Sequence, residues 1–159
     1  AYVISNPRLR DQFYQQLAEV YYRLERYPES DRYFDKALAI NDKNATVLNN
    51  YAYYLAERQE RLSKALEMTR QSNQLQPDNP TFLDTWAWVL YKMERPAEAL
   101  KKMRRVIELS SAPDGEVLEH YGDILKAAGK QDQAREWYQK ALDQAPENED
   151  LREKIKQLP

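Results

Sequence analysis

The residues that could do chemistry in this chain gather around its only histidine, His120. Glu116 lies one helical turn before it, and Glu119 and Asp123 are close by in the sequence. An imidazole and carboxylates at this spacing could share a metal ion, or the imidazole could serve as the base for a serine nucleophile. Two such ligands one turn apart are common on helices by chance, and nothing places a serine near His120. We therefore expect a surface histidine, with no metal and no cofactor.

The composition removes several other kinds of enzyme site. The chain has no cysteine, which excludes a thiol nucleophile, a disulfide framework and a thiolate zinc site. Its three glycines, at positions 115, 122 and 129, are too scattered to form a phosphate-binding loop. We therefore expect that the protein is not an enzyme.

The charges give no reason to expect nucleic acid as a target. There are 24 Lys and Arg against 26 Asp and Glu, a net charge of −2, whereas affinity for nucleic acid depends mainly on neutralising phosphates. The basic run at 101–105 is best explained as the solvated side of a helix, with contact to an acidic partner or anionic lipid as the alternative. No apolar run approaches the roughly 18 residues that span a bilayer, so we expect no insertion into a membrane.

The elements that carry these side chains repeat along the chain. One series of small residues recurs in steps of 34, 35 and 35, and a second recurs in steps of 35, 34 and 35. The first series is Ala18, Ala52, Ala87 and Gly122, and the second is Ser30, Ala65, Ala99 and Ala134. Two series with one period indicate a repeated unit of about 34 residues.

Each unit has the apolar spacing of a helical hairpin. In the third unit the residues Leu83, Trp86, Ala87 and Leu90 follow the i, i+3, i+4, i+7 pattern of one helix face. Trp88 lies two residues after Trp86, which is a rotation of about 200° on a helix. We therefore expect Trp86 in the core and Trp88 pointing outward.

This pattern resembles the tetratricopeptide repeat family. The last unit carries it best, in Leu118, Tyr121, Gly122, Leu125, Gly129, Ala134, Tyr138, Ala141 and Pro146. The resemblance implies an all-α fold, an α-solenoid wound as a right-handed superhelix of four hairpins with a C-terminal capping helix. We expect a single domain over 1–159, with a lead-in from a preceding repeat at 1–10, repeats at 11–44, 45–79, 80–114 and 115–148, and the capping helix at 149–159.

Two places depart from a plain array of repeats. Ala52 and Ala65 are 13 residues apart where the other units have 12, so the turn near 58–61 holds one extra residue. At the start, the apolar residues Tyr2 to Ile4 suggest the remnant of a preceding repeat. This N-terminal end is therefore a candidate surface for self-association.

The resemblance places function on the concave face formed by the first helix of each repeat, where the family usually binds peptides or partner helices. The residues one step past each buried stripe are expected to form this site: Tyr22, Asn49, Asn50, Tyr53, Asp84, Trp88, Tyr91, Lys92, Glu119, His120 and Asp123. The aromatic residues would supply apolar contact, the asparagines and Asp84 would fix a partner's backbone, and the last carboxylates would favour a basic side chain. The competing interpretation is that these aromatic residues only pack against the neighbouring repeat.

The sequence therefore supports two functional hypotheses. The first is a scaffold or adaptor that binds a protein or peptide partner in its concave groove, and the alternative is the structural end of a longer solenoid that mediates stacking or self-association. The stretches LNNYAYYLAER and LDTWAWVLYKMERPAEAL resemble C-terminal repeats of bacterial envelope proteins of this family, notably in the Bacteroidota. This resemblance favours a bacterial source, and a periplasmic or envelope location over the cytoplasm.

Overall fold

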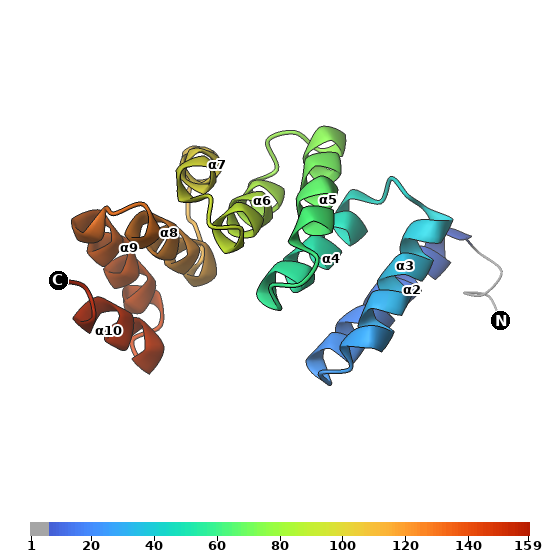
Figure 1. Ribbon diagram of the computed structural model, residues 1–159, viewed down its shortest axis with the longest axis horizontal. Coiled ribbons are helices and arrows are strands. Elements are labelled where there is room, and N and C mark those ends of the chain that lie inside the picture. Colours follow the sequence, from blue (N-terminus) through green and yellow to red (C-terminus); the bar gives the residue numbers. More distant parts are fainter. Residues whose placement is uncertain (1–6) are drawn as a thin grey trace. The chain divides into compact units, whose positions relative to one another are not determined.

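The described part of the chain is built only from α-helices. The computed structural model describes residues 7–159, with side chains from Leu9 onward, so the predicted role of Tyr2 to Ile4 lies outside the described residues. The helices within 7–159 are α2 (Pro7–Arg23), α3 (Tyr27–Ile40), α4 (Ala45–Glu57), α5 (Leu62–Leu75), α6 (Pro80–Lys92), α7 (Pro96–Leu109), α8 (Gly115–Ala127), α9 (Gln131–Gln144) and α10 (Glu149–Lys156) (Figure 1). The predicted all-α class is confirmed.

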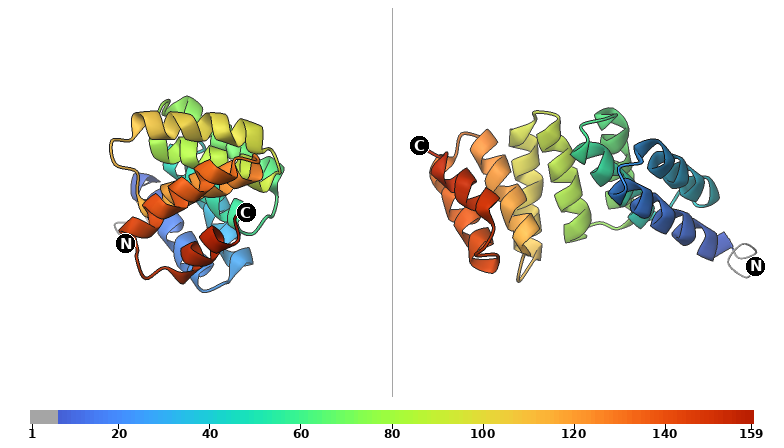
Figure 2. Two further views of the ribbon diagram at one scale, coloured as in Figure 1. Left: turned by 90° about the vertical axis from the view of Figure 1, so that its left-hand side faces the viewer. Right: turned by 90° about the horizontal axis from the view of Figure 1, so that it is seen from below.

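Consecutive helices pair as hairpins. The first helices α2, α4, α6 and α8 pack on the second helices α3, α5, α7 and α9, respectively, and α10 packs on α9 (Figures 1 and 2). The chain divides into two compact units, Ala1–Pro77 with α2 to α5, and Asp78–Pro159 with α6 to α10. The expected division of one domain into six segments stays a prediction.

Side-chain caps fix where α4, α6, α8 and α10 begin. Asn44 Oδ1 accepts a hydrogen bond from the Val47 amide at 3.1 Å, and Asn79, Asp114 and Asn148 cap the other three helices in the same way. Each cap satisfies an amide that the first helical turn leaves free. The polar residues between repeats therefore set the start of each of these helices.

The turn inside each hairpin contains at least one residue in the left-handed region. These residues are Glu25, Gln59, Glu94 and Gly129, with φ of 57°, 53°, 58° and 74°. The α4–α5 turn has four residues, 58–61, where the other three turns have three, and Arg61 in it also has a positive φ of 45°. The predicted extra residue in this turn is confirmed.

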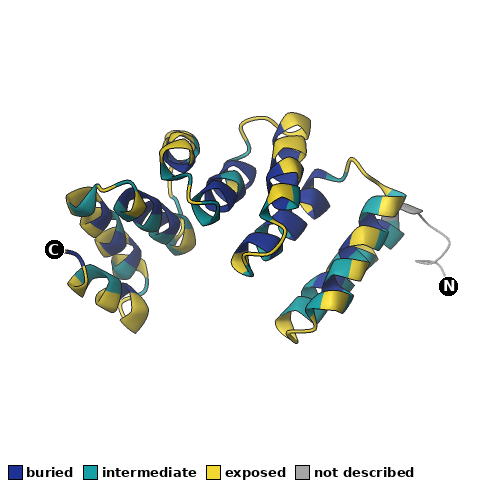
Figure 3. Cartoon of the chain, in the orientation of Figure 1, coloured by how far each residue is buried: buried dark blue, intermediate teal, exposed yellow. Residues whose placement is uncertain are grey.

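The two predicted series of small residues lie in the core. Their six alanines are fully buried, and Ser30 and Gly122 are buried as well. Figure 3 shows buried segments, in dark blue, along the helices of each hairpin. A Cβ added to Gly122 would overlap the Tyr138 ring of α9. Small residues at these positions therefore let the two helices of a hairpin approach closely.

Candidate functional site

Within each unit the predicted site residues lie on two first helices that contact each other, on a side that we call the first-helix face of that unit. In the first unit this face is formed by α2 and α4, and in the second unit by α6 and α8, which contact each other pairwise. Because a first helix borders the next one along this face, its side chains meet across the boundary between hairpins.

In the first unit, polar side chains connect α2 to α4. Glu19 Oε1 accepts hydrogen bonds from Gln15 Nε2 at 2.9 Å and from Asn50 Nδ2 at 3.0 Å. Asn49 Nδ2 donates to Asn50 Oδ1 at 3.3 Å, but the Asn49 side chain is buried. This burial gives Asn49 little surface for a partner, and its role in fixing a partner's backbone stays a prediction, while Asn50 is half-buried and keeps an edge at the surface.

Four half-buried tyrosines adjoin this polar network. We call Tyr22, Tyr27, Tyr53 and Tyr54 the tyrosine cluster. The Tyr22 ring lies 4.0 Å from that of Tyr54 and 5.3 Å from that of Tyr27, and the Tyr53 and Tyr54 rings are 5.7 Å apart. Burial, followed by the charge of Glu57, raises the pKa of Tyr22 to about 12, so its hydroxyl stays neutral. The two tyrosines predicted on this face therefore belong to one aromatic surface.

In the second unit, a buried histidine joins α6 to α8. His120 Nδ1 lies 3.2 and 3.1 Å from the two carboxylate oxygens of Asp84, and both residues are buried. The Trp88 ring stacks on His120 with 3.9 Å between ring centroids, and Lys92 Nζ lies 4.5 Å from the Trp88 centroid. Tyr91 also stacks on Trp88, at 4.9 Å. These five residues form what we call the His120 cluster.

The pKa of His120 reflects opposing influences. Burial lowers it, but the hydrogen bond to Asp84 and the charges of Asp84, Glu116 and Asp123 outweigh burial and raise the pKa above its ordinary value. The fold therefore favours the imidazolium form over the neutral one, and the contact between His120 and Asp84 bridges α6 and α8.

Three expectations about this cluster are wrong. Trp88 does not point outward, since it is only 7% exposed. Trp86, expected in the core, is half-buried, with Lys102 Nζ 3.4 Å from its ring centroid. His120 is not a surface histidine, because it is 5% exposed. The reason is the same for Trp88 and His120: each lies one step past the buried stripe, where the neighbouring first helix covers it.

The acidic end of the face already contains a basic group from the chain itself. Lys154 of α10 lies 2.7 Å from Glu119 and 2.8 and 2.9 Å from the two carboxylate oxygens of Asp123. Burial lowers the pKa of Lys154, but hydrogen bonds to Asp123 and Glu119 raise it overall. Tyr138 Oη donates to Asp123 Oδ1 at 2.6 Å. The basic side chain that we expected from a partner is therefore supplied by the capping helix.

Lys154 was not among the predicted site residues, although the repeat spacing contains a signal for it. Glu19 and Asn50, which meet across α2 and α4, are 31 residues apart, and Asp123 and Lys154 are separated by the same interval. A search for complementary polar residues at this interval would have paired Lys154 with Asp123.

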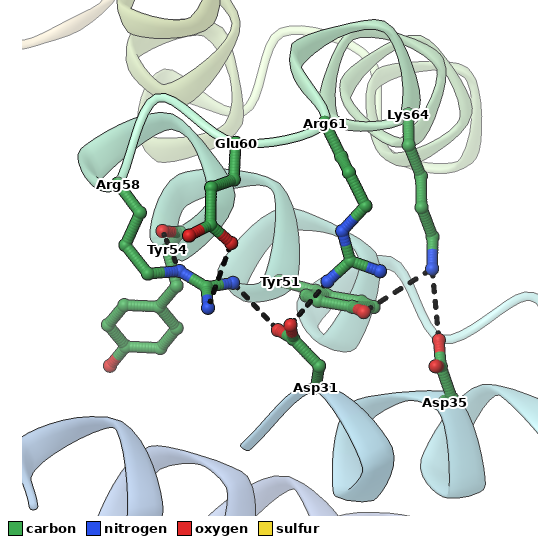
Figure 4. Close-up of polar contacts among 8 residues, drawn as sticks. All are labelled: Asp31, Asp35, Tyr51, Tyr54, Arg58, Glu60, Arg61 and Lys64. Carbon is green, nitrogen blue, oxygen red and sulfur yellow. Dashed lines mark hydrogen bonds and ion pairs between the residues drawn. The ribbon is translucent and has the colours of Figure 1, made fainter. Parts of the chain in front are cut away.

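A charged cluster in the first unit was also not predicted. Asp31 of α3 accepts hydrogen bonds from Arg61 and, at 2.7 Å, from Arg58, both in the turn with the extra residue (Figure 4). Lys64 Nζ lies 3.0 Å from Asp35. These residues, except Lys64, line an open pocket of about 890 Å³. Because the charges pair with one another, we assign the cluster to holding α3 against α4 rather than to a ligand.

No metal site is found in the described range. Among residues 7–159, no group of three or more His, Cys, Asp or Glu side chains is arranged to hold a metal ion. His120 Nδ1 faces Asp84, and Nε2 lies 3.9 Å from Glu116. None of the helices in the same range is long and apolar enough to cross a bilayer.

Comparison with known families agrees with the repeat spacing and the hairpins. Two tetratricopeptide repeat models match this chain, one over residues 12–44 and the other over residues 85–149. The chain belongs to the tetratricopeptide repeat family. Proteins with this repeat are generally interaction modules without catalytic activity.

Two relatives from Pseudomonas aeruginosa share part of the sequence of this tetratricopeptide protein. A TPR repeat-containing protein is 36% identical over 54% of this chain and 14% of its own length, and the type IV pilus assembly protein PilF is 30% identical over 69% of this chain and 43% of its own length. The chain therefore spans less than half of either relative. Both relatives agree with the predicted bacterial character of the chain.

Solved structures show the same fold. PilF superposes with a TM-score of 0.65 at 28% identity, covering 79% of this chain and 57% of that one. YrrB, described as a TPR protein with an unusual peptide-binding site, superposes with a TM-score of 0.64 at 22% identity, covering 89% of this chain and 72% of that one.

Proposed function

We propose that this chain is a non-enzymatic module that binds an extended segment or a helix of another protein along its first-helix face, as a scaffold or adaptor. The observation that carries the proposal is the set of half-buried aromatic residues beside polar groups already held in place by hydrogen bonds. Rigid aromatic anchors with few freely rotating polar neighbours are what binding faces use, because little side-chain entropy is lost on binding.

The accessible residues of this face differ from the full predicted set. Tyr22, Asn50 and Tyr53 in the first unit, and Tyr91 and Lys92 in the second, are half-buried and can touch a partner. The remaining predicted residues, which are Asn49, Asp84, Trp88, Glu119, His120 and Asp123, would act by holding neighbouring helices in position. Recognition would therefore rest on tyrosine edges, with a smaller electrostatic contribution than the sequence suggests.

The relatives support a peptide or protein as the partner and the bacterial envelope as the location. YrrB is described by its peptide-binding site, and PilF takes part in type IV pilus assembly. We propose by analogy that the partner is a peptide or protein at the bacterial envelope, in the periplasm or at a membrane surface.

A peptide-display selection tests the binding proposal. The full chain would be used to select peptides from a random library, and the affinity of a selected peptide would be compared between wild type and Tyr53→Ala. Loss of a central aromatic contact should weaken binding by about 1–2 kcal/mol, or roughly five- to thirtyfold.

A matched control is Tyr33→Ala, a half-buried tyrosine on the second helix α3. It should leave the affinity unchanged once the folded fraction of each variant is measured. Equal losses for Tyr33→Ala and Tyr53→Ala, or no selected peptide at all, would count against the first-helix face.

A further inference from the structure

One side of α2, continued by Leu24 directly after its last residue, carries an exposed apolar stripe. Phe13, Val20 and Leu24 are 44%, 52% and 61% exposed, and Leu17 between them is half-buried. Their sequence steps of four, three and four residues form a straight line along a helix, which is the spacing used where one helix packs along another. We call Phe13, Leu17, Val20 and Leu24 the α2 seam.

The α2 seam is separate from the first-helix face. Glu19 and Tyr22 of α2 face α4, through the bond to Asn50 and the ring contact with Tyr54. At about 100° of rotation per residue, the α2 seam points in roughly the opposite direction. No helix among residues 7–77, the described part of the first unit, covers that side, which explains the exposure.

The next hairpin shows what covers the same register position within this unit. The residues 34 positions after the α2 seam are Val47, Tyr51, Tyr54 and Arg58. Val47 and Tyr51 are fully buried. Tyr51 stacks on Phe34 of α3 with 4.8 Å between ring centroids, and Arg58 pairs with Asp31 of α3 (Figure 4). The equivalent seam of α4 is therefore covered by the second helix of the hairpin before it.

The second unit repeats this arrangement. The equivalent residues of α8 include Tyr121 and Ile124, both buried, and α7 packs on α8. In both units, then, this register position of a first helix meets a second helix. The α2 seam is apolar, as expected of residues that a second helix covers, yet its side chains are exposed to solvent.

We propose that the α2 seam is a docking surface for the second helix of another helical hairpin of this repeat type. Leu24 occupies the position of Arg58, so the incoming helix needs an apolar side chain where α3 has Asp31. The outer side of α10, which another copy of the chain could offer from its opposite end, is polar: Arg152, Glu153, Lys156 and Gln157 are exposed. That surface would leave the α2 seam without apolar contact, so a hairpin is the better match.

The test adds such a hairpin to the full chain. Asp11 is equivalent in register to Ala45 and Gly115, the first residues of α4 and α8. A copy of residues 80–114 inserted between Arg10 and Asp11 therefore presents a second copy of α7 to α2 at the spacing found before α8. The probe is the inserted α7, and the readout is amide hydrogen exchange in α2.

Docking predicts that exchange in α2 slows by about tenfold or more in the extended chain. The substitutions Val20→Gln and Leu24→Gln together should abolish this slowing, yet change exchange in the unextended chain by less than about twofold, because both side chains are exposed there. Leu75→Gln on α5, which is 41% exposed and outside the α2 seam, should have no effect in either chain.

Two results would overturn the proposal. One is an extended chain in which α2 exchanges as fast as before, or in which its protection survives Val20→Gln with Leu24→Gln. The other is sedimentation of the unextended chain as a dimer that Leu24→Gln dissociates, which would assign the α2 seam to a second copy of the chain.

Discussion

His120 couples two helices through a charge that depends on pH. Its pKa is raised in the folded chain, because the contacts with Asp84 outweigh the effect of burial. A group whose pKa is higher in the folded than in the unfolded state, where it is about 6.5, stabilises the fold fully below that unfolded value. This contribution is lost as the pH rises through the folded pKa.

We therefore expect the free energy of unfolding to fall as the pH rises above about 6.5, the unfolded value of a histidine. Because His120 is the only histidine, His120→Gln should remove most of this dependence, and so should Asp84→Asn. Urea unfolding of the three proteins across this range is the measurement. Parallel curves for wild type and His120→Gln would show that the pair is not coupled to folding.

Lys154 holds α10 against α8 through two carboxylates that are themselves partly buried. Lys154→Met keeps the apolar stem but leaves Glu119 and Asp123 without their cation, so we expect a loss of about 1–2 kcal/mol in unfolding free energy. Lys156→Met is the matched control, since that side chain is 72% exposed and 4.0 Å from Glu153. A similar loss for both variants would attribute the effect to overall charge.

The residues that sequence reasoning misplaced share one cause. The spacing correctly located Trp88, Asp84 and His120 one step past the buried stripe. The sequence of a single helix, however, does not reveal which neighbouring helix covers side chains at that position. The covering atoms belong to a helix about 35 residues away. By contrast, Tyr22, Tyr53 and Tyr91 have open edges, because the side chains beside them on the neighbouring helix do not cover them fully.

At the scale of helices, Gly122 and Tyr138 form a size-matched pair between α8 and α9. Gly122→Ala should destabilise the chain by about 1–3 kcal/mol, because the added Cβ overlaps the Tyr138 ring. In the background of Tyr138→Met, which resembles the Ala87 and Met103 pair of the third hairpin, the same substitution should cost much less. Thermal unfolding of the four proteins of this cycle measures the difference, and equal costs in both backgrounds would rule out the steric explanation.

The hairpin turns offer a stabilising change. Glu94 adopts a left-handed conformation with φ of 58°, which costs a side-chain-bearing residue about 1–2 kcal/mol, while glycine loses about 0.5–1 kcal/mol through its greater freedom when unfolded. Glu94→Gly should therefore stabilise the chain by about 0.5 kcal/mol. Met93→Gly, with φ of −86°, should destabilise it instead, and chemical denaturation would show whether the two changes have opposite signs.

The helices were predictable because their signals are local. Asn44, Asn79, Asp114 and Asn148 cap helices at the boundaries that the turn residues suggest. The extra residue near Arg58 was visible as a change in spacing. The ion pairs that this turn makes were not predictable from the spacing, because Arg58 and Arg61 pair with Asp31, which lies 27 and 30 positions away in the sequence.

At the scale of the whole molecule, repeat proteins are stabilised by contacts between neighbours. Helix α10 packs on α9, and Arg135 of α9 donates hydrogen bonds to the carbonyls of Ile155 and Leu158. Removal of residues 149–159 should speed amide exchange in α8 and α9 by about tenfold, while exchange in α2 and α3 stays unchanged. An equal increase throughout the chain would show that the chain unfolds as one cooperative body.

The stacking of Trp88 on His120 also has an optical consequence. The two rings are nearly parallel, 18° apart, with 3.9 Å between their centroids. An excited indole transfers an electron to a protonated imidazole in contact with it more readily than to a neutral one. The fluorescence intensity of Trp88 should therefore increase as His120 loses its proton. Intrinsic fluorescence would then report on the contact between α6 and α8.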